Sequence, residues 1–172
     1  MKLKTRQITF LGMIAVFAMM VSYLERLIPP LIPALPGIKP GLANIVVLVL
    51  LYLKGHKEAF FINILRILLV GLLFTGVWGA VYALSGAILS FVMMSLFKAF
   101  RCFGIVGVSV IGGAFHNLGQ ICVAVLTMGS VRLFYYFPVL LISGIITGAF
   151  IGFLSGVFIR RMRSVDIERA AR

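Results

Sequence analysis

The chain has 172 residues, of which 62% are hydrophobic and 12% charged, and its mean hydropathy is +1.18. A soluble domain of this size could not cover so much apolar surface with polar side chains, so the lipid bilayer is the expected solvent. The formal net charge is +12, but the basic residues stand singly or in pairs between apolar runs. That pattern is typical of topology signals and argues against a nucleic-acid-binding surface.

The first apolar run spans residues 7–24 and follows a short basic segment. It lacks a small-residue cleavage site, and several equally long runs come after it, so a retained membrane helix is predicted rather than a secretory signal. Five prolines follow within residues 26–40. Because each proline removes a backbone donor and restricts the residue before it, this stretch is predicted to be a structured loop or broken helix at the membrane face.

The rest of the chain contains five more apolar segments. A hydrocarbon core of about 30 Å requires roughly 20 apolar residues per helix, or fewer where the bilayer thins. The segments that meet this requirement are residues 41–53, 59–74, 79–97, 103–126 and 136–159. The predicted fold class is therefore an all-α integral membrane protein, a six-transmembrane-helix bundle in which residues 1–172 form one membrane domain.

The distribution of basic residues predicts the orientation of this bundle. With the N-terminus inside, twelve of the sixteen fall on the cytoplasmic side, and they are Lys2, Lys4, Arg6, Lys54, Lys57, Lys98, Arg101, Arg160, Arg161, Arg163, Arg169 and Arg172. The opposite side holds Arg26, Lys39 and Arg132, and Arg66 lies within a span. This positive-inside bias predicts that both ends are cytoplasmic (N-in/C-in) in a multi-pass protein of the cell membrane, a prokaryotic plasma membrane.

Glycines recur at a spacing of four in the last span, and they are Gly144, Gly148, Gly152 and Gly156. Glycines at that period line one stripe of a helix, so that another backbone can approach closely there. The favoured interpretation is tight packing within the chain. Docking of another subunit on the stripe is the alternative.

The polar residues inside predicted spans are the candidate functional residues, because an ionisable group in hydrocarbon costs at least a few kcal/mol unless it is paired or faces a cavity. Arg66 and Asn63 share a face of the third span, and Asn44 lies one turn into the second. In the fifth span His116 and Gln120 share a face, whereas Asn117 is offset by about a hundred degrees. We expect these six side chains to form a polar ligand-binding cavity. Interhelical hydrogen bonds without a ligand are the alternative.

Acidic residues are scarce, and Glu25, Glu58, Asp166 and Glu168 all fall outside or at the edge of the predicted spans. A diphosphate site built on Mg²⁺ would need several carboxylates close together. Within the spans only His116 could titrate near neutral pH, which argues against autonomous proton coupling. We therefore expect no metal site, no bound cofactor and no enzymatic activity. Cys102 and Cys122 are expected to stay unpaired.

Three features together resemble a known family, and they are residues 36–44 (PGIKPGLAN), residues 116–120 (HNLGQ) and the glycine-rich last helix. Over residues 5–162 the chain is similar to the Gx transporter family, also labelled heptaprenyl diphosphate synthase component I. That family resembles the substrate-binding S components of energy-coupling factor (ECF) transporters. The resemblance implies an S-component-like fold whose ligand pocket opens outward, and a partner complex of a transmembrane coupling subunit with two ATPases.

The chain departs from that family pattern in its first helix. S components commonly dock through two alanines four residues apart, but here Met19 stands four residues after Ala15. A looser series of small residues is left, formed by Gly12, Ala15, Ala18 and Ser22. This departure puts docking on a standard coupling subunit in question.

Three functional hypotheses follow. The first is capture of a small vitamin-, cofactor-precursor- or isoprenoid-like ligand by an S-component-like subunit. The second is a membrane subunit of an assembly with redox partners, in which the polar cluster holds a quinone or flavin. The third, a lipid-embedded enzyme, is the weakest, because His116 has no carboxylate nearby in sequence to orient it.

Overall fold

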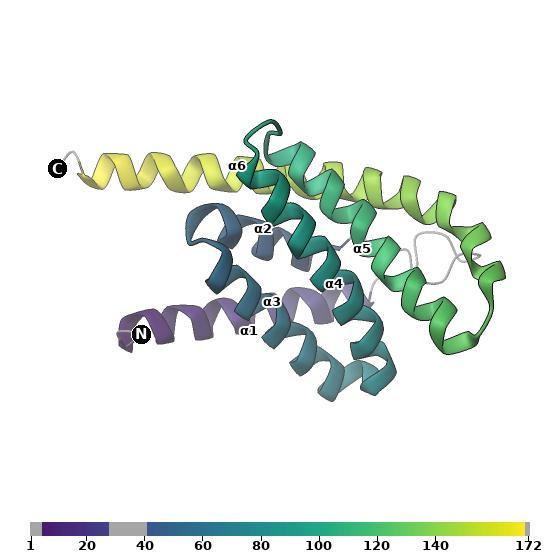
Figure 1. Ribbon diagram of the computed structural model, residues 1–172. Coiled ribbons are helices and arrows are strands. Elements are labelled where there is room, and N and C mark those ends of the chain that lie inside the picture. The colour runs from purple at the N-terminus through teal and green to yellow at the C-terminus, as the bar shows by residue number, and fades with distance from the viewer. Residues whose placement is uncertain (1–4, 28–40, 171–172) are drawn as a thin grey trace.

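The computed structural model describes residues 5–27 and 41–170, and these residues form helices and turns with no strand among them (Figure 1). The α-helices are α1 (Thr5–Leu27), α2 (Ala43–Leu53), α3 (His56–Val70), α4 (Gly76–Ala99), α5 (Ile105–Met128) and α6 (Phe137–Ala170). A π-helical turn, η1 (Gly71–Thr75), joins α3 to α4, and a 3-10 segment, η2 (Val131–Tyr136), precedes α6. Each apolar run of the sequence thus corresponds to a helix. The bounds lie a few residues from those predicted, except that α6 continues to Ala170, eleven residues beyond the predicted end at 159.

Gly76 divides the longest helical stretch into two. Its φ of 72° lies in the left-handed region that glycine adopts without a Cβ clash. The chain reverses direction here, so that α3 with η1 and α4 form an antiparallel hairpin (Figure 1).

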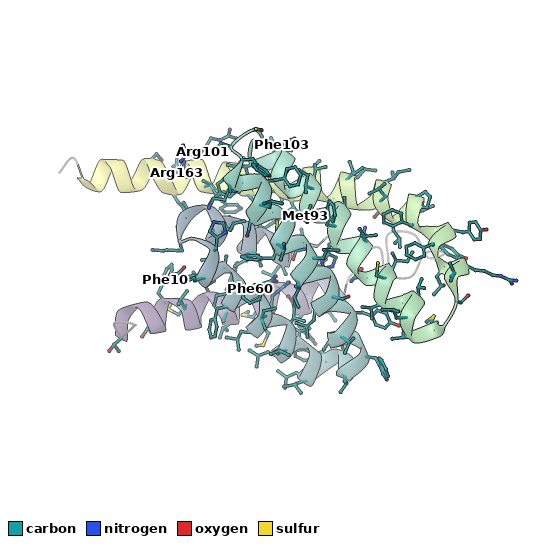
Figure 2. The ribbon with its side chains drawn as sticks, viewed as in Figure 1. Phe10, Phe60, Met93, Arg101, Phe103 and Arg163 are labelled. Atoms are coloured by element: carbon teal, nitrogen blue, oxygen red, sulfur yellow. The ribbon has the colours of Figure 1, made fainter. Side chains whose placement is uncertain are left out.

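Three helical stretches within the described residues are long and apolar enough to cross a membrane, and they are His56–Ala99, Ile105–Met128 and Val131–Ser164. Two shorter apolar helices, Thr9–Glu25 and Ala43–Leu53, accompany them. Large apolar side chains project outward along these helices, as they do from Phe10 and Phe60 (Figure 2). The chain is accordingly a helical, membrane-embedded protein.

The two ends of the bundle differ in charge. The first turn of α1, the end of α6, the turn between α2 and α3 and the connection between α4 and α5 lie at one end (Figure 1). We term this the basic end, because it carries Lys54, Lys57, Lys98, Arg101 and Arg163. Figure 2 shows Arg101 and Arg163 close to the α4–α5 connection. The opposite end is formed by the end of α1, the start of α2, η1 and η2.

Helix α5 packs between α4 and α6, and small residues let the three backbones approach. A Cβ atom on Gly148 would lie 2.7 Å from the carbonyl oxygen of Ser109, and one on Gly152 would lie 2.7 Å from Cα of Val106. On the other face of α5, a Cβ on Gly119 would lie 2.6 Å from the carbonyl oxygen of Ser85. Glycine is therefore required at these crossings, where a methyl group would force the helices apart.

The predicted glycine stripe of α6 is only partly a packing surface. Gly144, Gly148 and Gly152 face the backbone of α5, which is the packing within the chain that the sequence favoured. At Gly156 an added Cβ would meet only the Arg160 side chain, 3.9 Å away, so this glycine makes no close helix crossing. The stripe therefore packs along three of its four positions.

The small residues of α1 also lie inward. Ala15 and Ala18 are buried, and they pack in a core with residues of α2 and α3. Gly12, by contrast, is exposed, and a Cβ there would have no neighbour within 4 Å. The two alanines are thus covered by the chain itself.

This apolar core occupies the half of the bundle nearer the basic end. Its largest fully buried members include Leu48 and Leu51 of α2 and Ile62 of α3, and Met94 and Val108 join it from α4 and α5. Helix α2 has 11 residues and is therefore about 16 Å long, roughly half of the hydrocarbon thickness.

The proline-rich stretch is described only at its start. Arg26 and Leu27 continue α1 instead of beginning a loop, which corrects the predicted boundary. Residues 28–40, including most of the PGIKPGLAN segment, lie outside the described residues.

Candidate functional site: a polar cavity at the end opposite the basic end

A cavity of about 220 Å³ opens among all six helices. It is lined by Ser22, Glu25, Gly41, Asn44, Arg66, Ile67, Val70, Thr75, Gly79, Ala83, Gly113, His116, Asn117, Gln120, Leu140, Ser143, Thr147 and Ile151. These residues come from the later parts of α1 and α3, the middle of α5, and the earlier parts of α2, α4 and α6, with Gly41 just before α2 and Thr75 in η1. The cavity therefore lies on the side of the apolar core that faces away from the basic end.

Arg66 is the cationic residue of this cavity, and its side chain is 8% exposed. Nη2 donates to Oδ1 of Asn63 at 2.9 Å and to Oδ1 of Asn44 at 3.3 Å. Nη1 donates to Oγ of Ser22 at 3.1 Å. These bonds hold the guanidinium against α1, α2 and its own helix.

The hydrogen bonds of the Arg66 guanidinium go to uncharged groups. All three acceptors are neutral oxygens, and no carboxylate forms an ion pair with the guanidinium within the described part of the chain. Three of the five N–H groups are used, and Nε is buried without a partner there. Because an unpaired buried charge is costly, this guanidinium favours the arrival of an anion.

Glu25 is the anionic residue of the cavity, and its side chain is 7% exposed. Its Oε1 accepts a hydrogen bond from the backbone N–H of Gly41, just before α2. Gly41 has a φ of 71°, a left-handed conformation in which glycine is unstrained. The carboxylate therefore ties the end of α1 to the start of α2.

Helix α5 contributes the amides and the imidazole. The Asn117 side chain donates from Nδ2 to the carbonyl oxygen of Leu140 at 2.5 Å, which joins α5 to α6. His116 and Gln120 lie against α4, where a Cβ on Gly86 would come within 3.0 Å of His116 Cε1 and 2.9 Å of Gln120 Cγ. The cavity reaches both faces of α5, which explains how Asn117 lines it despite its angular offset.

The structure brings most of the sequence-predicted site residues together. Five of the six line the cavity, and they are Asn44, Arg66, His116, Asn117 and Gln120. Asn63 is not in the lining, but it accepts the shortest hydrogen bond of Arg66 and lies behind it. Their role in ligand binding stays a prediction.

Two lining residues at the end of α1 were missed from the sequence. The sequence groups Ser22 with the small residues of α1 and places Glu25 outside or at the edge of the predicted spans. Their separation of three residues places them on one face of α1, which is the signal that could have joined them. Nothing local to α1 indicates that this face meets Arg66.

Metal-ligating residues do not gather in the described part of the chain, where no three His, Cys, Asp or Glu side chains lie close enough to hold a metal ion. Cys102 and Cys122 are both free thiols. Among the described residues, the polar groups that line the cavity are one guanidinium, one carboxylate, one imidazole, amides and hydroxyls.

Comparison with known proteins gives one match. A family model described as heptaprenyl diphosphate synthase component I matches residues 14–158, which is most of the chain and runs from within α1 to within α6. No curated protein and no solved structure matches the chain. The chain therefore belongs to the heptaprenyl diphosphate synthase component I family, the Gx-transporter-like group that its motifs resemble.

Proposed function

We propose that this protein is a membrane-embedded, S-component-like subunit that captures a small ligand with an anionic group. The observation that carries the proposal is the guanidinium of Arg66, which lines a cavity, is nearly fully buried and donates only to neutral oxygens. A ligand carboxylate or phosphate at this point would give the guanidinium an anionic acceptor in direct contact. Such charge-assisted bonds are about twice as strong as neutral ones.

The proposed topology has six spans with both ends in the cytoplasm. The hairpin at Gly76 makes two crossings of the stretch His56–Ala99. The two shorter helices, α1 and α2, supply two more, and α5 and α6 complete the six. Basic residues gathered at the end that holds the start of α1 and the end of α6 support this orientation. The cavity then opens toward the outside.

The proposed partners are a transmembrane coupling subunit and two ATPases. The family membership supports this, because the family is Gx-transporter-like. The docking surface would have to differ from the small-residue series of α1, since Ala15 and Ala18 are buried in the chain's own core. An enzymatic role is not proposed, because prenyl diphosphate chemistry on Mg²⁺ needs several carboxylates and Glu25 is the one carboxylate in the described lining.

The test is extraction of the ligand from protein gently purified from its own membranes. Native mass spectrometry would compare the wild type with Arg66→Ala and with Arg163→Ala, an exposed arginine at the basic end. We expect a small acidic molecule in the wild type and Arg163→Ala, and its loss in Arg66→Ala. A wild type without ligand, or a ligand unaffected by Arg66→Ala, would overturn the proposal. A coloured complex with flavin- or quinone-carrying subunits would instead support the redox alternative.

A further inference from the structure

Two buried side chains of opposite charge share the cavity without pairing to each other. Arg66 and Glu25 both line it, and neither is more than 8% exposed. The guanidinium is held by three neutral oxygens, and the carboxylate by the N–H of Gly41. Opposite charges in a low-dielectric site attract strongly. Here each group hydrogen-bonds its own partners instead of the other charge.

The Arg66 guanidinium contacts α1 one turn before the position of Glu25. Ser22 bonds Arg66, and Glu25 follows Ser22 by three residues on the same face. Three residues advance a helix by about 4.5 Å. Cα of Glu25 therefore lies about one turn beyond Cα of Ser22, farther along α1 from the buried Ala18.

We propose that the ligand of this cavity is a small zwitterion, with its anionic group on Arg66 and a protonated amine on Glu25. The inference rests on the proposed function and narrows its ligand class. A simple anion at Arg66 would leave Glu25 buried and uncompensated beside it, and a simple cation at Glu25 would do the same to Arg66. A molecule with both groups neutralises both charges.

The size and the remaining lining agree with such a ligand. A volume of about 220 Å³ is below the roughly 300–1,000 Å³ of sites for drug-sized ligands. It suits a molecule nearer the size of an amino acid than of a dinucleotide. Gln120, Ser143 and Thr147 of α5 and α6 also line the cavity and can hydrogen-bond a polar body. Apolar side chains such as Ile67 and Leu140 complete the lining.

The experiment uses the full-length protein in nanodiscs and three probe sets of matched carbon number: ω-aminocarboxylates, alkyl carboxylates and alkylamines. Apparent Kd values come from the concentration dependence of the thermal unfolding midpoint. The variants are Glu25→Gln, which keeps an oxygen for the Gly41 N–H, and Arg66→Gln. The matched controls are Glu58→Gln and Arg163→Gln, whose side chains do not line the cavity.

We expect the wild type and both controls to bind an aminocarboxylate at least tenfold more tightly than the matched carboxylate or amine. Glu25→Gln should shift the preference to carboxylates, and Arg66→Gln should shift it to amines. Equal binding of carboxylates and aminocarboxylates by the wild type, or an unchanged preference in Glu25→Gln, overturns the zwitterion and leaves anion capture standing.

If no probe binds, the chemical groups of the molecule extracted from the native protein test the zwitterion proposal. An extracted ligand that reacts with both amine-specific and carboxyl-specific reagents supports the zwitterion. One with an acidic group and no amine refutes it while the capture function survives. The absence of any extracted ligand removes the capture function as well, so the two failures are distinguishable.

Discussion

Gly144 of α6 and Gly113 of α5 meet so closely that a Cβ atom on Gly144 would lie 2.6 Å from the carbonyl oxygen of Gly113. The same Cβ would lie 2.8 Å from Nδ2 of Asn117, the amide that bonds Leu140. Backbone and a hydrogen-bonded amide cannot yield as a flexible side chain can. This crossing thus fixes both the spacing of two helices and one wall of the cavity.

Gly144→Ala is accordingly expected to destabilise the protein by about 1–3 kcal/mol, the usual range for overpacking. The matched control is Gly156→Ala in the same helix and stripe, where the nearest atom to the new Cβ is 3.9 Å away. That change should be neutral, or stabilising by up to about 1 kcal/mol from helix propensity. Thermal unfolding in detergent measures the stability of both variants. Equal losses of stability in Gly144→Ala and Gly156→Ala would contradict the packing argument.

Asn63→Ala is expected to destabilise the protein by about 1–3 kcal/mol, because it removes the acceptor 2.9 Å from Nη2 of a buried arginine. In an Arg66→Leu background, Asn63→Ala should change the free energy of unfolding by a different amount. The double-mutant cycle should give a coupling energy between Asn63 and Arg66 of about 0.5–3 kcal/mol. The exposed Tyr82–Thr127 bond at 2.6 Å serves as the reference pair. Coupling no larger than that of the reference would show that Arg66 does not depend on Asn63.

Lys98→Met is expected to increase local opening at the C-terminal end of α2. Nζ of Lys98 donates to the carbonyl oxygen of Leu51 at 2.5 Å, which satisfies one of the last carbonyls of that helix. Losing a charge-assisted bond worth about 1.5–3 kcal/mol should speed amide hydrogen exchange over residues 50–55 by roughly tenfold or more. The exposed Lys57→Met is the control, and similar exchange in both variants would refute the capping role.

The two native cysteines test the proposed topology. Cys102 is exposed between α4 and α5 at the basic end, whereas Cys122 lies within α5. A membrane-impermeant maleimide should label Cys102 in permeabilised cells and not in intact ones. In a Cys102→Ser background, Tyr135→Cys, at a position 85% exposed within η2, should be labelled in intact cells. The reverse pattern would invert the orientation.

The helices follow from the sequence because each apolar run needs a helix to satisfy its backbone in lipid. The association of Arg66 with Asn63 follows from their spacing of three residues. The bonds from Arg66 to Ser22 and Asn44 cross 44 and 22 residues of sequence. No local pattern encodes which face of α1 or α2 will meet α3, so these bonds could not be predicted.

The hydrogen bond of Glu25 could not be predicted from the sequence either. A carboxylate at the edge of an apolar run usually marks the membrane interface, and the sequence gives no sign that the N–H of Gly41 will bind it. The sequence predicts that Gly148 packs against another helix, because glycines at its spacing are typical of helix crossings. The open surroundings of Gly156 could not be predicted, because they depend on where α5 begins relative to α6.

The apolar core beneath the cavity also has an electrical consequence. In the proposed orientation the cavity is continuous with the outer face, so most of the transmembrane voltage falls across the dry layer of Leu48, Leu51, Ile62 and their neighbours. Moving one elementary charge through that voltage changes the free energy by about 2.3 kcal/mol per 100 mV. An anion passing inward would have to be driven against a negative interior. A ligand with balanced charges would cross the same layer without electrical work, whatever the membrane potential.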